Sequence, residues 1–368
     1  MKIIEATIYK LNLPLNAPFE TSAVYMNTKK TLILALKDDK GNTGFGECSA
    51  LERPFYSEEF RDGALILLEF QLLPMIVGHY ISHPDDTEII FKAFRNNRMA
   101  KSAINSALWD LFSKQNNMPL YKALGGNKNN VETGVSIGIQ ESPNKLVSVV
   151  KSKIDEGYRR IKVKIKPGKD FSYLKAVREK YPDITLTADA NSSYSLDSIQ
   201  IFQEMDSLNL DMIEQPLEPG DLVNHSELQS KIKTPICLDE SISSLDDAIA
   251  MVKLGSGKII NIKVSRVGGL TMSKKIQEYA LKHNIDCWSG GMLDTGIQRV
   301  QNIAIATLPG YTLANDIAPS TRYFDNDIIS PTVTLNGSYI DVPQGIGMGY
   351  NINWLNLQKY TSETKIIR

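Results

Sequence analysis

Cysteine and histidine are scarce in this chain. Its 368 residues include four histidines and three cysteines, Cys48, Cys237 and Cys287. The cysteines are odd in number and widely separated, which argues against a disulfide framework and indicates free thiols in a reducing compartment, so we expect a cytoplasmic protein. A catalytic cysteine is disfavoured too, because Cys237 lies in a short apolar run and is best explained by packing.

Long apolar runs and blocks of one charge are also missing. No stretch approaches the roughly 18 apolar residues of a membrane span, and the N-terminus lacks the apolar core and small-residue cleavage site of a secretion signal. The 41 basic and 42 acidic residues give a net charge of −1, with no basic block. Because phosphate neutralisation needs a cationic face, we expect no nucleic-acid partner, and we expect no membrane partner either.

The pattern of predicted strands and helices changes twice along the chain, which predicts a discontinuous domain organisation. Residues 1–126 open with strand-like alternation and continue into an amphipathic helical stripe, as an α+β domain would. A break around Pro119 and Gly125 ends this pattern. Residues 127–330 alternate strand and helix, and residues 331–368 read as short strands that we expect to rejoin the first domain.

Two segments of the first domain carry large apolar residues in loop-like, polar surroundings. They lie at about residues 15–28 and 50–58 and include Phe19, Phe55 and Tyr56. Such residues can form a lid over a site in the second domain, although plain interdomain packing would explain them equally well.

The middle of the chain predicts a closed parallel barrel. Strand-like runs alternate with helical stretches, the pattern of βα units with right-handed crossovers. The predicted fold class is therefore α/β, a (β/α)8-type TIM barrel with an α+β capping domain formed by the N-terminus and the C-terminal tail. The eight predicted strands lie near residues 133–139, 161–165, 185–189, 211–215, 235–239, 259–264, 285–290 and 311–316.

Charged residues recur near the ends of five of these runs at intervals of 25, 25, 25 and 24 residues: Lys164, Asp189, Glu214, Asp239 and Lys263. One βα unit takes about that length, so all five should ring the mouth of the barrel. A single acid at a strand end can simply cap the next helix. Three in succession favour a metal site instead, and ligands without His or Cys favour Mg²⁺ over zinc.

The two lysines favour proton-transfer chemistry beside that metal. Lys164 and Lys263 stand in otherwise apolar runs, on strands that flank the acidic ones. Lys162 lies two residues from Lys164 on the same side of its strand, and a second ammonium nearby would lower the pKa of Lys164 towards that of a useful base. A Lys base paired with Mg²⁺ is the pattern of enolase-type sites.

These motifs resemble the enolase superfamily, muconate-lactonizing-enzyme subgroup, over nearly the whole chain. The resemblance rests on GECSA and LGG in the first domain, KxK ending at Lys164, DAN at Asp189, EQP at Glu214, DE at Asp239 and NIKVSRVGG around Lys263. Within the subgroup, GVSIGIQ, PFYSEE, SGGMLDTGIQR and NDIAPSTRYF resemble the branch of o-succinylbenzoate synthases that shares sequence with N-succinylamino acid racemases. The chain departs from the usual pattern at Asp294, Asn315 and Pro319, all at the substrate end.

The resemblance implies a role for each matching residue. Asp189, Glu214 and Asp239 would bind Mg²⁺, for which Mn²⁺ can substitute. Lys164 would act first as the base and then as the acid. Lys263 would stabilise the intermediate as a cation and, in a racemase, would exchange a proton on the opposite face of the substrate carbon. Further residues expected to bind substrate or support the site are Lys162, Ser136, Asn191, Arg266, Gly291, Met292, Phe19 and Tyr56.

The expected activity is Mg²⁺-dependent syn dehydration of 2-succinyl-6-hydroxy-2,4-cyclohexadiene-1-carboxylate to 2-succinylbenzoate, a step of menaquinone synthesis. N-succinylamino acid racemisation is the alternative, and both activities can coexist; a dipeptide epimerase is a more distant one. A non-catalytic barrel would not need both lysines, and a metal hydrolase would usually need histidine ligands. The expected partners are a small-molecule carboxylate substrate and further copies of the chain in a homo-oligomer.

Overall fold

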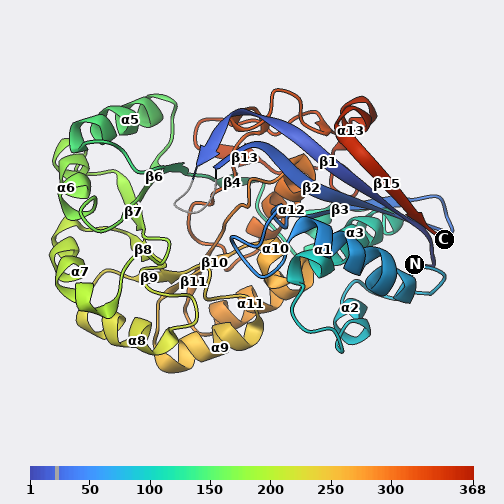
Figure 1. The fold of residues 1–368 in the computed structure, drawn as a ribbon, viewed down its shortest axis with the longest axis horizontal. Coiled ribbons are helices and arrows are strands. Elements are labelled where there is room, and N and C mark those ends of the chain that lie inside the picture. The colour runs from blue at the N-terminus through green and yellow to red at the C-terminus, as the bar shows by residue number, and fades with distance from the viewer. Residues whose placement is uncertain (21–24) are drawn as a thin grey trace.

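The computed structural model describes residues 1–20 and 25–368 and contains two layers of different type, a small antiparallel sheet and a larger parallel one. Figure 1 shows the parallel strands enclosed by an arc of helices on one side and the antiparallel sheet with its own helices on the other. Both chain termini lie on the side of the antiparallel sheet.

The antiparallel sheet has four strands in the order β15-β1-β2-β3. The last strand of the chain, β15, pairs with β1, and the hairpin of β2 and β3 turns at residues 39–42. The strands are β1 (Ile3–Glu20), β2 (Tyr25–Asp38), β3 (Thr43–Cys48) and β15 (Thr361–Ile367).

One long helix packs directly against this sheet. The amphipathic stripe predicted in the first domain lies in α3 (Arg98–Gln115), whose inward side chains are mostly small or aliphatic. Gly46 on β3 makes the close approach possible, because a Cβ there would stand 2.0 Å from the Ala103 carbonyl oxygen. The other helices on this side are α1 (Arg61–Leu67), α2 (Asp86–Ile90), α4 (Leu120–Leu124) and α13 (Trp354–Tyr360), with the short turns η1 (Leu68–Leu72) and η2 (Leu73–Met75).

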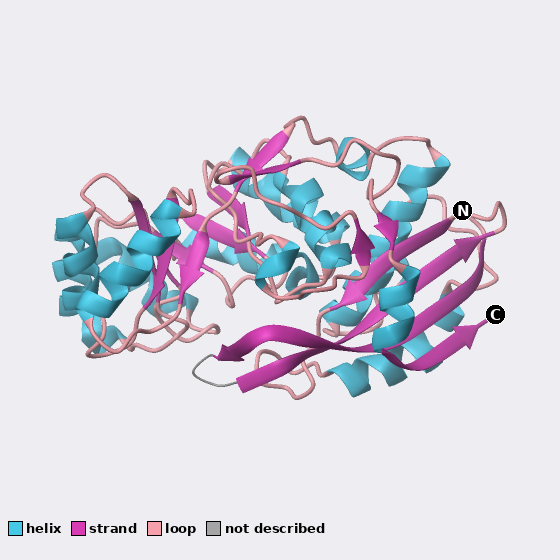
Figure 2. Cartoon of the chain, turned by 90° about the horizontal axis from the view of Figure 1, so that it is seen from above, coloured by secondary structure: helices cyan, strands magenta, loops and turns pink. Residues whose placement is uncertain are grey.

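The segment expected as a lid loop at 15–28 belongs largely to strands. β1 and β2 continue their antiparallel pairing outward to Phe19 opposite Met26 and Glu20 opposite Tyr25. Figure 2 shows this hairpin extending beyond its sheet towards the parallel strands. The side chain of Phe19, which was expected to contact substrate, lies outside the described residues.

Seven parallel strands form the larger sheet in sequence order, and each coincides with a predicted strand. Their apolar residues are buried almost without interruption, as expected for strands covered on one face by helices and on the other by the barrel interior. They are β5 (Val135–Ile137), β6 (Arg160–Lys164), β7 (Thr185–Asp189), β8 (Met212–Glu214), β9 (Ile236–Leu238), β10 (Ile259–Ile262) and β11 (Asp286–Ser289).

Helices follow these strands and cover the outside of the sheet. Several begin at a polar cap whose side chain accepts a first-turn amide: Ser142, Asp221 and Ser244. The helices are α5 (Pro143–Asp155), α6 (Phe171–Lys180), α7 (Ile199–Met205), α8 (Leu222–Lys231), α9 (Leu245–Leu254), α10 (Val264–Val267), α11 (Leu270–Lys282) and α12 (Gly296–Ala306), with the short turns η3 (Leu196–Ser198), η4 (Asp206–Leu208) and η5 (Ser320–Arg322).

The eighth predicted strand, near residues 311–316, is an extended segment without a regular ladder. Isolated parallel bridges join Tyr311 to Cys287 and Asn315 to Thr133, so the segment still lies between β11 and the start of β5. The Asn315 side chain accepts a hydrogen bond from the Ser289 amide at 2.7 Å and donates one to the Glu132 carbonyl at 2.9 Å. A side chain therefore supplements the backbone hydrogen bonds where the barrel closes, and the predicted α/β barrel class is confirmed.

Short strands from the end of the chain pack beside the barrel. β4 (Asn130–Glu132) pairs with β13 (Tyr339–Asp341), and β12 (Ile329–Ser330) pairs with β14 (Asn351–Ile352).

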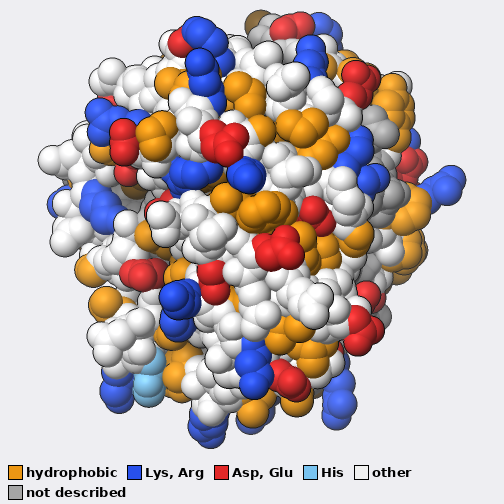
Figure 3. Space-filling view, turned by 90° about the vertical axis from the view of Figure 1, so that its left-hand side faces the viewer, with side chains coloured by type: hydrophobic (Ala, Val, Ile, Leu, Met, Phe, Trp, Pro, Cys, Tyr) orange, Lys and Arg blue, Asp and Glu red, His pale blue; other side chains and the backbone are white. Residues whose placement is uncertain are grey.

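The surface mixes both charges. On the face seen in Figure 3, lysine and arginine side chains are interspersed with aspartate and glutamate, in keeping with the near-zero net charge of the chain. Within the described residues, none of the helices combines the length and hydropathy needed to cross a bilayer.

Candidate active site

Three buried carboxylates stand at the carboxyl ends of neighbouring parallel strands. Asp189 ends β7, Glu214 ends β8, and Asp239 directly follows β9. In the ladder, Lys164 lies opposite Asp189, and Asp189 lies opposite Glu214. For Lys164, Asp189 and Glu214, equal spacing along the sequence has thus become matching register in the sheet, whereas Asp239 lies two residues beyond Cys237, the partner of Glu214.

Lys162 is buried and closely paired with acids. Its Nζ lies 2.8 Å from Glu214 Oε2, 2.7 Å from Asp316 Oδ2 and 3.6 Å from Asp189 Oδ2. Burial opposes a charge there, but Asp316 and Glu214 outweigh it and raise the pKa of Lys162 well above its usual value. This lysine is therefore a fixed cation of the site.

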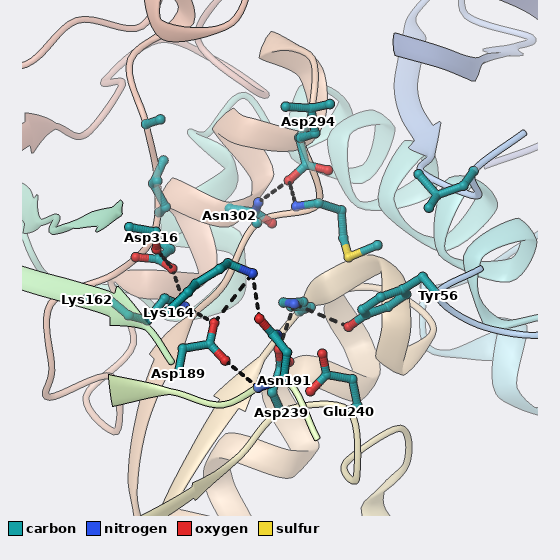
Figure 4. Close-up of a pocket in the computed structure, with 18 of the residues that line it drawn as sticks. Tyr56, Lys162, Lys164, Asp189, Asn191, Asp239, Glu240, Asp294, Asn302 and Asp316 are labelled. Carbon is teal, nitrogen blue, oxygen red and sulfur yellow. Dashed lines mark hydrogen bonds and ion pairs between the residues drawn. The ribbon is translucent and has the colours of Figure 1, made fainter. Parts of the chain in front are cut away.

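Lys164 has a more open position. Its Nζ donates to Asn191 Oδ1 at 2.6 Å, while its carboxylate neighbour Asp189 lies 3.9 Å away. Its side chain is 25% exposed, against 7% for Lys162 and 13% for Lys263. Figure 4 shows the Lys164 amine projecting over Asp189 and Asn191. Of the three lysines, Lys164 has the side chain most accessible to a ligand.

Lys263 directly follows β10, on the other side of the acidic strands, and is held by two partners. Its Nζ lies 2.7 Å from Asp239 Oδ2 and 3.2 Å from the Tyr56 hydroxyl, and 5.0 Å from the centre of the Tyr56 ring. Burial opposes its charge, but Asp239 and Tyr56 outweigh that effect and raise the pKa of Lys263.

Arg266 completes this second cluster. Its guanidinium pairs with Asp239 and donates to the Tyr56 hydroxyl at 3.1 Å and to the Ile242 carbonyl at 2.9 Å. Tyr56 belongs to the 50–58 segment of the first domain, so the two domains meet at the basic groups of the site.

The electrostatic environments of the carboxylates differ. Burial and the charge of Asp189 raise the pKa of Glu214 to about 8. Burial acts in the same direction on Asp239, but Arg266 and Lys263 outweigh it and lower the pKa of Asp239 to about 2. Negative charge is thus well compensated at Asp239 and poorly compensated at Glu214.

The chemistry of the three carboxylates fits a hard divalent cation. All their donor atoms are oxygen, and the raised pKa of Glu214 marks negative charge that a cation would relieve. With the side chains as they stand in residues 1–20 and 25–368, no three acidic, histidine or cysteine groups cluster closely enough to hold a metal ion. Ammonium groups instead pair with the carboxylate oxygens.

A cavity of about 410 Å³ opens above these groups. Ten of the residues singled out in the sequence line it: Tyr56, Ser136, Lys162, Lys164, Asp189, Asn191, Asp239, Lys263, Gly291 and Met292. Glu214 and Arg266 do not line it and act on it through Lys162, Asp239 and Tyr56. Met26 from β2 and Leu51 and Phe55 from the 50–58 segment contribute apolar lining.

Sequence reasoning missed several polar residues that line the cavity, among them Arg299, Asn302 and Asp316, and two that lie beside the carboxylates. Asn261 donates to Glu214 Oε1 at 2.8 Å, and Glu240 lines the cavity beside Asp239. Burial and Asp239 raise the pKa of Glu240 to about 7. Asn261 could have been found, because it lies two residues before Lys263 and strand side chains alternate. Glu240 is the second residue of the DE motif, but only Asp239 of that pair was given a role.

The fold and the site together define a class: barrel proteins whose strand-end carboxylates and lysines are covered by a second, α+β domain. The chain matches the mandelate racemase / muconate lactonizing enzyme N-terminal domain over residues 3–125 and the enolase C-terminal domain-like family over residues 145–356. It therefore belongs to the muconate-lactonizing-type branch of the enolase superfamily, as the sequence motifs predicted.

Characterised relatives extend over the full chain. An o-succinylbenzoate synthase from Bacillus subtilis (strain 168) is 42% identical, covering 100% of this chain and 98% of the relative. An N-succinylamino acid racemase from Thermus thermophilus is 41% identical over 98% of both chains. Among solved structures, an enolase-superfamily protein from Listeria innocua superimposes with a TM-score of 0.98 at 38% identity, covering 100% of this chain and 99% of the other.

Proposed function

We propose that this chain is an o-succinylbenzoate synthase, a lyase that dehydrates 2-succinyl-6-hydroxy-2,4-cyclohexadiene-1-carboxylate to 2-succinylbenzoate in menaquinone biosynthesis. The observation that carries the proposal is the placement of Lys164 at the end of β6 and Lys263 directly after β10, on either side of the strands that present three carboxylates. Full-length similarity to synthases of this name supports the choice of reaction.

Asp189, Glu214 and Asp239 would hold one Mg²⁺ or Mn²⁺, which when bound would polarise the substrate carboxylate as a Lewis acid. Lys162 would remain a cation between these carboxylates and Asp316, where it limits their mutual repulsion. Asn261 would fix the orientation of Glu214 through its hydrogen bond.

Lys164 would act as both base and acid. Its amine reaches the cavity, so it can take the proton from the carbon that bears the carboxylate. The same protonated amine can then deliver that proton to the departing hydroxyl on the same face, which gives a syn elimination. Asn191 would orient the amine through its side-chain oxygen.

Lys263 would act as a cation in this reaction. Asp239 and Tyr56 hold its ammonium group at the other side of the cavity, where it can stabilise negative charge as it develops on the substrate. No proton needs to leave Lys263 for dehydration.

N-succinylamino acid racemisation is the second candidate. The observation that favours it is that lysines stand on both sides of the cavity, since racemisation needs a proton donor and acceptor on each face of the same carbon. Relatives with this name are also similar over nearly the full chain.

Dipeptide epimerisation is less well supported. It would need an acid from the 311–316 segment to bind a substrate ammonium. Asp316 instead contacts Lys162 and Arg160, each at 2.7 Å, and accepts from Ser136 at 2.9 Å, so its oxygens are already engaged. The homo-oligomer and the cytoplasmic location stay predictions.

The test is an assay of the purified chain with Mg²⁺ on two substrates, the cyclohexadiene carboxylate and an N-succinylamino acid. The proposal expects formation of 2-succinylbenzoate, lost on chelation and restored by Mg²⁺ or Mn²⁺. Racemisation without any dehydration would replace the proposal with the second candidate, and dehydration in fully chelated enzyme would contradict the metal assignment.

A further inference from the structure

A buried ion pair of the capping sheet faces one turn of the barrel. Lys29 on β2 and Glu47 on β3 both have fully buried side chains, with Nζ and Oε1 4.0 Å apart. Lys29 Nζ donates to the Met292 carbonyl at 3.2 Å. Glu47 Oε2 accepts from the Thr295 amide at 3.0 Å and from its hydroxyl at 2.7 Å. The pair therefore holds both ends of the turn at residues 292–295, which follows β11.

The turn between these two ends has a strained backbone, and a third residue of the capping domain forms a hydrogen bond to it. Leu293 has a φ of +60°, a conformation that non-glycine residues adopt only when their surroundings enforce it. Ser49, just after β3, donates to Asp294 Oδ1 at 3.0 Å. Asp294 Oδ2 accepts from the Met292 amide and from Asn302 Nδ2, both at 3.0 Å, and Figure 4 shows the bond to Asn302.

The strained turn is also a wall of the candidate site. Met292, Leu293 and Asp294 line the cavity, whereas Lys29 and Glu47 do not. Figure 4 shows Asp294 at the edge of the drawn groups away from Asp189 and Asp239, so the turn borders the part of the cavity that would receive the portion of a substrate away from the reacting carbon.

Stability alone is a poor explanation for the ion pair. Desolvation offsets most of the attraction between two buried charges, and apolar residues of similar size often serve as well. Burial raises the pKa of Glu47 to about 6 although Lys29 opposes that shift. What apolar residues could not supply is a pair of charge-assisted hydrogen bonds to the backbone of the turn.

We propose that Lys29 and Glu47 are positioning residues through which the capping domain fixes the 292–295 turn and so sets substrate selectivity. The ligand concerned is the acyl chain attached beside the reacting carbon, an identification that rests on the proposed function. Neither residue touches the reacting atoms, and the capping domain acts through the turn.

The kinetic test compares Glu47→Gln, Lys29→Met and the double variant. Each single change leaves one buried group without its partner and loosens the turn, so KM for the succinyl substrate should rise by about tenfold or more while kcat falls less. The double variant weakens both contacts to the turn, so its KM should be at least as high as that of the worse single variant. A double variant with a KM near that of the wild type would overturn the inference, because it would show that the turn does not depend on the pair.

A matched control is Lys114→Met, which removes another charge partner within the capping domain. Lys114 lies 2.7 Å from the buried Asp110, which bonds to the Phe45 and Met348 amides and not to the turn. This variant should lower the melting temperature and leave KM unchanged. A rise in KM equal to that of Glu47→Gln would reduce the pair to a general stabiliser and overturn the inference.

Amide hydrogen exchange tests the inference without any turnover. In Glu47→Gln, exchange of the segment 290–296 should accelerate by about tenfold or more, while the strands β6 and β7 keep wild-type protection. If this variant does not fold, Ser49→Ala, which removes the hydrogen bond to Asp294 and the one that Ser265 donates to Ser49, should accelerate the same segment by a smaller factor. Unchanged exchange of 290–296 would overturn the inference whatever the enzyme activity, whereas a wild type without dehydration would contradict only the proposed function.

Discussion

The residues of the site differ more in their surroundings than in their chemistry. Three lysines line the same cavity, yet Lys162 is enclosed by carboxylates, Lys263 is paired with Asp239, and Lys164 alone combines larger exposure with a neutral hydrogen-bond partner. The KxK spacing could be read from the sequence, but the different roles of Lys162 and Lys164 could not. They depend on Asp316, which pairs with Lys162 and comes from a segment about 150 residues further along the chain.

Loss of the Lys164 amine should therefore abolish turnover. We expect Lys164→Ala to lower kcat for dehydration by 10²–10⁴-fold, the usual range for a general base, and Lys164→Arg to do nearly the same because guanidinium stays protonated at neutral pH. Metal affinity, measured by calorimetry, should change little because Lys164 is not a ligand. A Lys164→Ala enzyme that keeps more than about a tenth of wild-type kcat would contradict the assignment.

The raised pKa of Glu214 predicts metal binding that depends on pH. Its folded-state pKa of about 8 means that the carboxyl is largely protonated at pH 7 and must lose that proton to become a ligand. We expect the Kd for Mg²⁺ to weaken by about tenfold per pH unit from pH 8 to pH 6, with release of close to one proton in calorimetry.

Asp239 provides an internal comparison, because its pKa of about 2 keeps it ionised through this whole range. The pH dependence should therefore disappear in Glu214→Gln, along with most of the affinity, and persist in variants elsewhere in the barrel. A Kd for the wild type that is constant between pH 6 and pH 8 would show that Glu214 is ionised before the metal arrives.

At the scale of the elements, the strands that end in candidate site residues were the easiest to predict. Runs such as residues 185–189 coincide with their observed strand because a short, buried parallel strand has a strong apolar signal. The segment 311–316 was predicted as a strand of the same kind, but its hydrogen bonds come partly from the side chain of Asn315. The outer arms of the β1–β2 hairpin read as a loop because they mix polar residues, Pro18 and apolar residues without a regular alternation.

The junction of β10 and β11 gives a prediction at this scale. Gly290 follows β11, and a Cβ there would stand 2.3 Å from Asn261 Oδ1 and 2.9 Å from Lys263 Cε. We expect Gly290→Ala to displace both side chains and to lower kcat on the order of 10²-fold, since small displacements of catalytic groups have effects of that size.

A suitable control is Gly138→Ala, at the same end of β5. A Cβ at Gly138 meets no atom within 4 Å, so activity should stay near that of the wild type. Urea unfolding of both variants separates loss of geometry from loss of fold. Equal kcat in the two variants would contradict the idea that close approach at Gly290 sets the position of Lys263.

At the scale of the whole molecule, neither domain forms the site alone. The barrel supplies carboxylates and lysines, while the capping domain supplies Tyr56 against Lys263 and the Lys29–Glu47 pair behind the 292–295 turn. Equal spacing of charges predicted the barrel contribution, because one βα unit has a nearly constant length. The capping contribution has no period, and its contacts join residues more than 200 positions apart, so only the folded chain reveals them.

The measurement that tests the account most directly follows both lysines in one sample. Wild-type and Lys263→Arg proteins are incubated in D₂O with each enantiomer of an N-succinylamino acid, and dehydration of the cyclohexadiene carboxylate is measured on the same preparations. Arginine keeps the charge but cannot exchange a proton at neutral pH. The account predicts that Lys263→Arg keeps dehydration within about tenfold of the wild type and still exchanges the enantiomer whose proton faces Lys164, while exchange of the other enantiomer is lost. Equal loss of dehydration and of exchange for both enantiomers would contradict the assignment of the two lysines to opposite faces of one site.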